Sequence, residues 1–546
     1  MKIDDILDRW KTAKKNKSAW HNHWDELARV MLPRREGFAS THATGEERTE
    51  QIYDGTPMQA ARGLANALDG FLWPEGEQSF HVRATEDSVD SAEEAQVWMA
   101  TAESRMNQAL DNPKARFRQA RGEVNQDLSV LGTAILFAGE SKNLDRLSFQ
   151  SVHLKDAAVL FDDEGQPTGL FRHKKPTIRQ AMARFGKENL SEETRKAIQS
   201  EKKLDSKIDV LHAVMLRDEG RPDALFASDL PFTNKFIEVK QKHEISDGGF
   251  HEFPFMIPRW DTSSGEDYGR SPGMIALPDS NTLQAMGETL LVAGQRAADP
   301  PLMAPNDGSF SEVNAFPGGL GYYDVETAAR IGRNPFFPLE TGSNMPLTQQ
   351  MQADVRDQVF RAFFRNILNL PVDGPQMTAT EIIERKEEFI REIGPVFGRL
   401  EGDYKAPLIE RVFNVMLRAG QFPDIPDVLS GQNIEFEYES PISKIRKQIQ
   451  ASAARQWAIE QVEYATVDPS AADLVNFEAL GRFNHAALGL PFEVINSEEV
   501  VAQRAQQRAE QQQAEALTAE LEQGAGIVDT AAAAAQKAGL TETANA

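Results

Sequence analysis

Between residues 264 and 420, apolar residues recur at helical spacing in two long segments that enclose an irregular insert, and a third such segment follows them. This pattern predicts three helices. The first helix is expected over 279–298, with Asp279 or Ser280 as its N-cap. We expect it to start after Pro278 and to end at the next pair of prolines, because proline lacks the amide hydrogen that a helix interior needs. Its predicted apolar face comprises Leu283, Met286, Leu290 and Leu291.

The second helix is predicted over 348–369, where an apolar residue recurs at every fourth position. These residues are Met351, Val355, Val359, Phe363 and Ile367. The insert between the two helices, 302–345, is rich in Gly, Pro and Asn and has no helical period. Such a composition is typical of turns and irregular structure rather than of a continued helix.

A turn at 371–377 leads into the third helix, which the capping box of Thr378 and Glu381 opens. This helix is expected to run over 378–419, to bend at its two internal prolines, Pro395 and Pro407, and to end at Gly420. Further helices are predicted over 441–466 and 469–488. Beyond Glu498 the chain is rich in Ala, Gln and Glu with little apolar surface, which predicts a helix held by neighbouring chains or a frayed end.

The first 260 residues mix helical periods with short segments of period two. Helices are predicted over 2–32, as one or two helices, and over 56–72, 91–110, 114–137 and 177–203, with the helix from 114 ending in the apolar run 134–137. Strands are predicted at 147–151, 159–161, 170–172, 208–216, 236–240 and 253–257. The turn at 162–165 resembles a hairpin between the second and third of these strands. The expected fold class is therefore mainly α with a small, mostly antiparallel β-subdomain, an α+β arrangement.

Length and charge bound the possible functions. The chain has 546 residues, enough for two to four packed units, and its 59 Lys and Arg against 83 Asp and Glu give a net charge of -24. Such a surface disfavours tight nonspecific binding of nucleic acid but permits a sliding contact. The absence of Cys excludes disulfides, thiolate zinc sites and cysteine nucleophiles. No apolar run approaches the roughly 20 residues of a membrane helix, so we expect a soluble protein with no membrane partner.

Two stretches imitate active sites. The sequence GRSPG at 269–273 matches the hydrolase elbow G-x-S-x-G, with Ser271 as nucleophile. That elbow needs the amide N–H of the next residue for its oxyanion hole, and Pro272 has none, so a tight turn before a helix is favoured. His21 and His23 diverge by about 200 degrees on a helix and cannot share a metal ion there.

Two further stretches have simpler interpretations. Gly318, Gly319 and Gly321 are not followed by the Lys-Ser or Lys-Thr pair of a phosphate-binding loop. The acidic run 381–392 interleaves carboxylates with Arg and Lys at helical spacings, which favours a solvated helix face over a metal or acid–base pair. We therefore expect no catalytic residue, no cofactor and no metal, and the sequence favours a mechanical or binding role.

Long blocks of the chain resemble the head-to-tail connector, or portal protein, of short-tailed bacteriophages of the T7-like kind. The similarity covers roughly residues 1–480 in the family's order. The blocks are WHNHWDELARVMLPRR at 20–35, IYDGTPMQAARGLANALDGFLWPEGEQSFHVR at 52–83, DLSVLGTAILF at 127–137, SGEDYGRSPGMIALPDSNTL at 264–283 and TATEIIERKEEFIREIGPVFGRLEGDYKAPLIERVF at 378–413.

The resemblance implies a ring, usually of twelve subunits, at one vertex of the phage head, with a tunnel for double-stranded DNA. It assigns parts to the chain in order. These are the wing at 1–263, a first stem helix within 264–301, the clip at 302–345, a second stem helix within 346–370, the tunnel loop at 371–377, the kinked wing helix at 378–420, the crown at 421–497, and the Ala/Gln-rich tail at 498–546.

The resemblance also implies partners and places. These are the large subunit of the terminase, the major capsid and scaffolding proteins, and a tail adaptor or tail tube protein, with the chain in the host cytoplasm during assembly and in the virion afterwards. The tunnel-loop residues expected to face DNA are Val372, Asp373, Gly374, Pro375 and Gln376. On the second stem helix, Arg356 and Asn366 are polar residues that could face DNA. The alternatives are a tail-adaptor or scaffold protein and a serine hydrolase that uses Ser271.

Overall fold

The computed structural model divides into two compact units, Met1–Ile442 and Ser443–Ala546, which are described separately. The described residues are 2–35, 37–38, 45–50, 52–74, 79–90, 92–141, 146–200, 203–218, 220–222, 224, 226–306, 316–324, 337–338, 345–365, 391, 394–438, 441–488, 494–496 and 500–513.

The first unit is mainly helical around one large hydrophobic core. Its N-terminal helices are α1 (Ile3–Ser18), α2 (His21–Met31), α3 (Thr56–Leu72), α4 (Asp87–Asp90), α5 (Glu93–Asp111) and α6 (Phe117–Leu131). Trp24 of α2, Leu68 of α3 and Leu128 of α6 are fully buried in this core. The predicted helices over 2–32, 56–72 and 91–110 are confirmed, the first as two helices.

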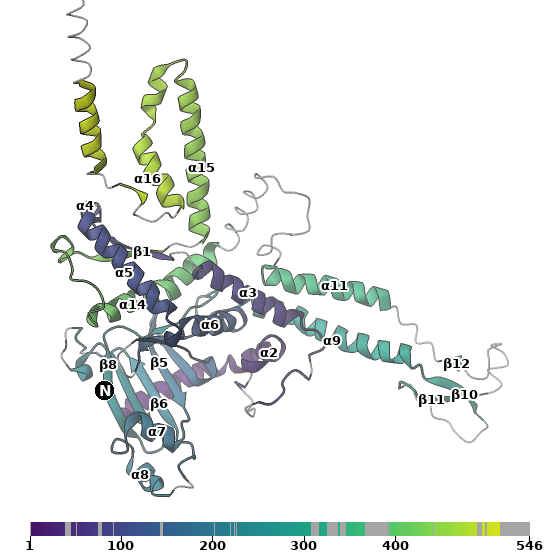
Figure 1. Cartoon of the computed structure of the whole chain (residues 1–546). Helices are drawn as coiled ribbons and strands as arrows, with labels where there is room; N and C mark the ends of the chain where they lie inside the picture. The colour runs from purple at the N-terminus through teal and green to yellow at the C-terminus, as the bar shows by residue number, and fades with distance from the viewer. Residues whose placement is uncertain are drawn as a thin grey trace, which may run out of the picture. The chain divides into compact units, whose positions relative to one another are not determined.

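The predicted β-subdomain is confirmed as a five-stranded antiparallel sheet in the order β4-β5-β6-β7-β8 (Figure 1). Its strands are β4 (Ala157–Phe161), β5 (Pro167–Lys174), β6 (Val210–Met215), β7 (Phe232–Glu238) and β8 (His243–Phe250). Strands β4 and β5 form the expected hairpin. One face of the sheet packs on α1 through a second core that includes Phe171, Leu211 and Ile237. Strand β8 was not predicted, because its Gly248 and Gly249 interrupt the apolar alternation.

The predicted single helix over 177–203 is wrong. The structure has two short helices there, α7 (Ile178–Phe185) and α8 (Glu192–Ile198). Gly186 follows α7 with a φ of 85°, a backbone conformation that ends a helix and that glycine adopts without steric cost. Ser191 then caps α8 by accepting a hydrogen bond from the amide of Thr194.

The expectation that the helix from 114 continues through the apolar run 134–137 is also wrong. Helix α6 ends at Leu131, and Gly132 takes a left-handed φ of 77°. The chain then enters β2 (Leu136–Glu140), the middle strand of a sheet with β3 (Leu147–Ser151) and β9 (Phe255–Met256). A short apolar run fits a buried strand as well as a helix end, and the pairing with distant strands decided between them.

A two-stranded sheet joins distant parts of the first unit. Strand β1 (Phe80–Ala84) pairs antiparallel with β13 (Ile434–Tyr438). Helix α14 (Ala406–Arg418) contributes Leu408, Ile409 and Val412 to the large core. The predicted crown, 421–497, therefore spans the boundary between the two units, because β13 belongs to the first.

Two long helices, α9 (Pro272–Ala298) and α11 (Met345–Ala362), lie side by side, and a small sheet follows α9 (Figure 1). This sheet comprises β10 (Leu302–Asn306), β11 (Leu320–Asp324) and β12 (Phe337–Pro338), with β10 and β11 parallel. The paired helices and the intervening insert were predicted. The start after Pro278 is wrong, because α9 begins at Pro272 and carries Pro278 inside it. The predicted end near 369 is also wrong: α11 ends at Ala362, and Phe364 has a φ of 58°.

The described part of the predicted third helix, residues 394–418, is helical with a π-helical turn at Glu401–Lys405. This turn widens the helix directly before Pro407, the position where a bend was expected. Gly420 follows α14 with a φ of 63°, which confirms it as the glycine that ends the helix. The capping box of Thr378 and Glu381 lies outside the described residues.

The second unit holds nearly all of α15 (Pro441–Tyr464) and all of α16 (Phe477–Leu488), with a 3-10 helix at Pro469–Leu474 between them. The first predicted C-terminal helix is confirmed, and the second, expected over 469–488, is shorter than predicted. Among the described helices, none combines the length and the apolar character required to cross a bilayer.

Candidate functional site

The candidate functional site is the stem hairpin, defined here as α9, α11 and the β10–β12 sheet between them. Its attachment begins at Ser271, which caps α9 by accepting a hydrogen bond from the amide of Met274 (3.1 Å). The same hydroxyl donates to the carbonyl oxygen of Val130 at 2.6 Å. Ser271 is 2% exposed and Pro272 follows it. The hydroxyl therefore serves the fold and is not available as a nucleophile.

The glycines of GRSPG allow two backbone segments to approach closely. A Cβ atom added at Gly269 would lie 2.5 Å from the carbonyl oxygen of Gly132, and one at Gly132 would lie 2.7 Å from the carbonyl carbon of Arg270. The amide of Gly269 donates to the hydroxyl of Thr133 at 2.8 Å. The end of α6 thus docks directly on the start of α9, and the hydrolase-like sequence is explained by packing.

A second attachment lies along the middle of the stem hairpin. Arg356 of α11 contacts Asp54 through two nitrogens, with Nε at 2.9 Å and Nη2 at 2.8 Å from the same carboxylate oxygen. The other oxygen of Asp54 accepts from the amide of Thr56 at 2.8 Å. Hydrogen bonds to Thr56 and Arg356 hold the pKa of Asp54 below its usual value, although burial opposes this shift. A nearly buried carboxylate before α3 therefore anchors α11.

The same segment also anchors α9. The side-chain oxygen of Gln284 accepts from the amides of Tyr53 (2.8 Å) and Asp54 (2.9 Å), and its nitrogen donates to the carbonyl of Asp54 at 2.7 Å. Nearer the start of α9, Asn281 donates to the carboxylate of Glu26 on α2 at 2.9 Å. Both stem helices are therefore fixed by polar contacts to the part of the first unit that holds α2, α3 and α6, called here the body.

The apolar residues of the stem hairpin change from buried to exposed along its length. Leu283, Val359 and Phe363, near the body, are fully buried. Leu291 and Met351, near the β10–β12 sheet, are 54% and 52% exposed. The predicted apolar faces are therefore confirmed only at the end where these residues are buried.

Most of the predicted DNA-facing residues lie outside the described residues. These are Val372, Asp373, Gly374, Pro375 and Gln376 of the tunnel loop, and Asn366. Arg356 is described, and its side chain is 43% exposed while it pairs with Asp54. Most of the acidic run 381–392 also lies outside the described part of the chain.

The candidate metal pair is not assembled in the structure. His21 and His23 both lie on α2, and burial lowers the pKa of each imidazole. Across the described ranges, no three His, Asp or Glu side chains converge as ligands of a metal ion would. Neither histidine contributes to the stem hairpin.

Comparison with known proteins decides the family. The family described as bacteriophage head to tail connecting protein matches residues 4–495. The chain belongs to this family. It is thus a portal protein of the phage head–tail junction, a structural component of the virion and not an enzyme.

Two curated relatives match nearly the whole portal chain. The probable portal protein of Bordetella phage BPP-1 is 27% identical over 96% of this chain and 94% of its own length. The portal protein of Salmonella phage epsilon15 is 25% identical over 93% of this chain and 91% of its own. Among solved structures, a chain from the virion of a native gene transfer agent particle is similar with a TM-score of 0.38 and 13% identity, covering 83% of this chain and 96% of that one.

Sequence reasoning missed the residues that attach the stem helices to the body of this portal protein. Asp54 and Gln284 are separated from their partners by hundreds of residues, so no local pattern connects them. Asp54 lies two residues before the first residue of α3, Thr56, and its carboxylate accepts a hydrogen bond from the amide of that residue. Its contact with Arg356 had no signal in the sequence.

Proposed function

We propose that the chain assembles into a ring of twelve at one vertex of the phage head, and that double-stranded DNA is packaged and ejected through the central tunnel. Membership of the head-to-tail connecting family is the observation that carries this proposal. The stem hairpin supports it. At 1.5 Å per residue, the 27 residues of α9 extend about 40 Å, enough for the wall of a tunnel.

The net charge suits a conduit. Each chain has a charge of -24, so a ring of such chains repels the phosphate backbone and DNA can slide without being held. Within the tunnel, residues 372–376 are proposed to contact DNA, with Arg356 and Asn366 as further candidates. Arg356 keeps 43% of its side chain exposed despite its ion pair, which leaves part of the guanidinium accessible.

The partners follow from the proposed position. The large subunit of the terminase docks on the clip during packaging, and a tail adaptor or tail tube protein replaces it afterwards. The major capsid and scaffolding proteins surround the wing while the head assembles. We also propose that the phage is short-tailed and of the T7-like kind. The three-stranded β10–β12 sheet supports the docking role, since it gives the insert between the two stem helices a folded structure of its own.

Electron microscopy and native mass measurement of the purified full chain test this proposal. We expect hollow rings with a mass near twelve chains. A chain that remains monomeric at every concentration and salt would instead favour a scaffold protein. The serine hydrolase alternative predicts a hydrolase activity that Ser271→Ala abolishes. We expect no such activity in the wild-type chain, because the Ser271 hydroxyl is buried and donates to the carbonyl oxygen of Val130.

A further inference from the structure

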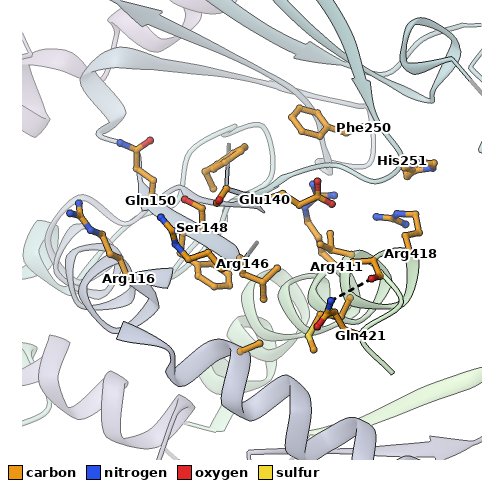
Figure 2. A pocket seen from close by; sticks show the side chains of 18 of the residues that line it. Arg116, Glu140, Arg146, Ser148, Gln150, Phe250, His251, Arg411, Arg418 and Gln421 are labelled. Atoms are coloured by element: carbon orange, nitrogen blue, oxygen red, sulfur yellow. Dashed lines mark hydrogen bonds between the residues drawn. The ribbon is translucent and has the colours of Figure 1, made fainter. Parts of the chain in front are cut away.

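A large cleft in the first unit has a charge opposite to that of the chain. It has a volume of about 1670 Å³, more than a typical small-molecule site. It lies between the β2–β3–β9 sheet, the five-stranded sheet, and helices α5 and α14. Seven Lys or Arg side chains line it, against a single carboxylate, Glu140. Figure 2 shows Arg116 and Arg146 on the left of this cleft and Arg411 and Arg418 on the right.

The cations at one end of the cleft are used by the fold. Glu252 pairs with Arg411 (3.1 Å) and also with Arg418, and the Nε atom of Arg411 donates to the carbonyl of Ala138 at 2.7 Å. Arg411 is 5% exposed, so this group joins α14 to the neighbouring strands. These arginines are structural and are not candidates for binding a ligand.

A second group of cations lies at the five-stranded sheet beside the cleft. Arg184 lines the cleft, whereas Arg172 and Lys174 lie next to it on β5, where Arg172 is paired in register with the cleft residue His212 of β6. Arg184 of α7 lies over the ring of Phe236, with 4.8 Å from its guanidinium carbon to the ring centre. Arg172 donates to the side-chain oxygen of Gln150 at 3.0 Å. Within the described part of the chain, no carboxylate lies within ion-pair distance of Lys174 or Arg184.

This group, called here the sheet cations (Arg172, Lys174 and Arg184), holds like charges together, with Arg172 and Lys174 half-buried and Arg184 exposed. Burial and then the charges of Arg172 and Arg184 lower the pKa of Lys174 to about 7. Burial and then the charges of Lys174, Arg172 and Arg184 lower the pKa of His212 to about 3. Asp156 acts on Arg172 and Lys174 in the opposite direction but does not reverse the shift. The repulsion between these charges therefore destabilises the isolated chain, and a bound anion would reduce that repulsion.

We propose that the sheet cations receive a carboxylate-rich segment from a neighbouring copy of this chain. The chain has 83 Asp and Glu residues, so its surface supplies such segments. A closed ring uses a heterologous interface, in which different faces of two copies meet, so a basic cleft on one copy can contact an acidic surface on the next. Guanidinium groups bind carboxylates with directed hydrogen bonds. A nucleic acid is disfavoured, because the net charge of -24 repels a polyanion.

The inference rests on the proposed ring, and charge reversal tests it on the full chain. The double variant Lys174→Glu with Arg184→Glu should raise the subunit concentration at half assembly at least about tenfold, measured by sedimentation and native mass. The matched control, Lys187→Glu with Arg195→Glu, makes the same change of charge at two exposed positions nearby. It should change that concentration less than about threefold.

The outcomes separate the inference from the proposed function. If wild type and both double variants form rings equally well, the inference fails and the ring proposal stands. If no version forms rings, both fail. A third outcome is that Lys174→Glu with Arg184→Glu assembles into rings normally but loses binding to a single-stranded oligonucleotide. This result would contradict binding of a neighbouring copy and would favour a nucleic acid as the partner of the sheet cations. Should the glutamate variant unfold, as judged by its thermal midpoint, Lys174→Gln with Arg184→Gln replaces it, with the same expected direction.

Discussion

At the scale of single residues, Gly132 determines how the stem hairpin joins the body. Its φ of 77° ends α6, and the space for a side chain is occupied by the backbone of Arg270. The substitution Gly132→Ala combines backbone strain with a steric clash, so we expect it to lower the free energy of unfolding by about 3 kcal/mol. Urea titration measures this.

Gly431 provides the matched control, because its φ of 80° is similar and nothing lies within 4 Å of an added Cβ. Gly431→Ala should therefore cost only the strain, about 1 kcal/mol. Equal losses in both variants would show that the close approach of the two segments contributes nothing.

Asp127 gives stability a dependence on pH. Burial raises its pKa to about 7, although the guanidinium of Arg35, 3.0 Å away, opposes the shift. In the unfolded chain this carboxyl titrates near about 4, so between about pH 4 and 7 the folded state holds a proton that the unfolded state has lost. Stability from this group therefore falls as the pH rises through that window.

Asp127→Asn should remove this component, on the order of a few kcal/mol between pH 4.5 and pH 7, so we expect a flatter stability profile for the variant than for wild type. Urea unfolding at several pH values measures the slope. Asp163→Asn, at an exposed position in the β4–β5 turn, should keep the slope of wild type. An unchanged slope in Asp127→Asn would contradict the assignment.

At the scale of elements, the ion pair between Asp54 and Arg356 ties α11 to the body. Arg356→Ala leaves the nearly buried carboxylate without its charged partner, and because Arg356 is itself partly exposed we expect a loss of about 1–2 kcal/mol. Hydrogen exchange should show faster opening of α11. Arg361→Ala, which breaks an exposed pair with Asp357, should have no measurable effect.

The proposed tunnel loop is an element whose removal separates two roles. Deletion of 372–376 should leave ring assembly intact, because the stem helices are anchored elsewhere, through Asp54 and Gln284. We expect the deletion to impair retention of packaged DNA, measured as nuclease-protected DNA in assembled heads. Loss of the rings themselves would show that these residues support the fold instead.

At the scale of the whole molecule, the charge of -24 predicts weak contact with DNA. Purified rings should bind a short duplex with a Kd weaker than about 10⁻⁴ M at physiological salt, since the net negative charge of each chain repels the phosphate backbone. Fluorescence anisotropy over a range of salt measures both the affinity and its slope. Tight binding with a steep salt dependence would contradict a conduit through which DNA slides.

The sequence by itself determined the elements with a strong local period, and its long blocks indicated the family. Helix α3 was predicted at its observed bounds, and four strands of the five-stranded sheet were predicted within a mostly antiparallel subdomain, because apolar spacing and turn residues act within a few positions along the chain. Pro272 argued against a hydrolase for the same local reason. Net charge, too, is a property of composition alone.

Only the tertiary structure decided features that depend on distant partners. Helix α9 begins at Pro272 because Ser271 and Gly273 pack against the end of α6, so the proline at 278 is tolerated inside it. Strands β1 and β13 form because each pairs with a segment more than three hundred residues away. Asp54 contacts Arg356, and the sheet cations lie together beside the cleft, only because the chain folds. Local periodicity carries no information on such contacts, since they arise when elements pack.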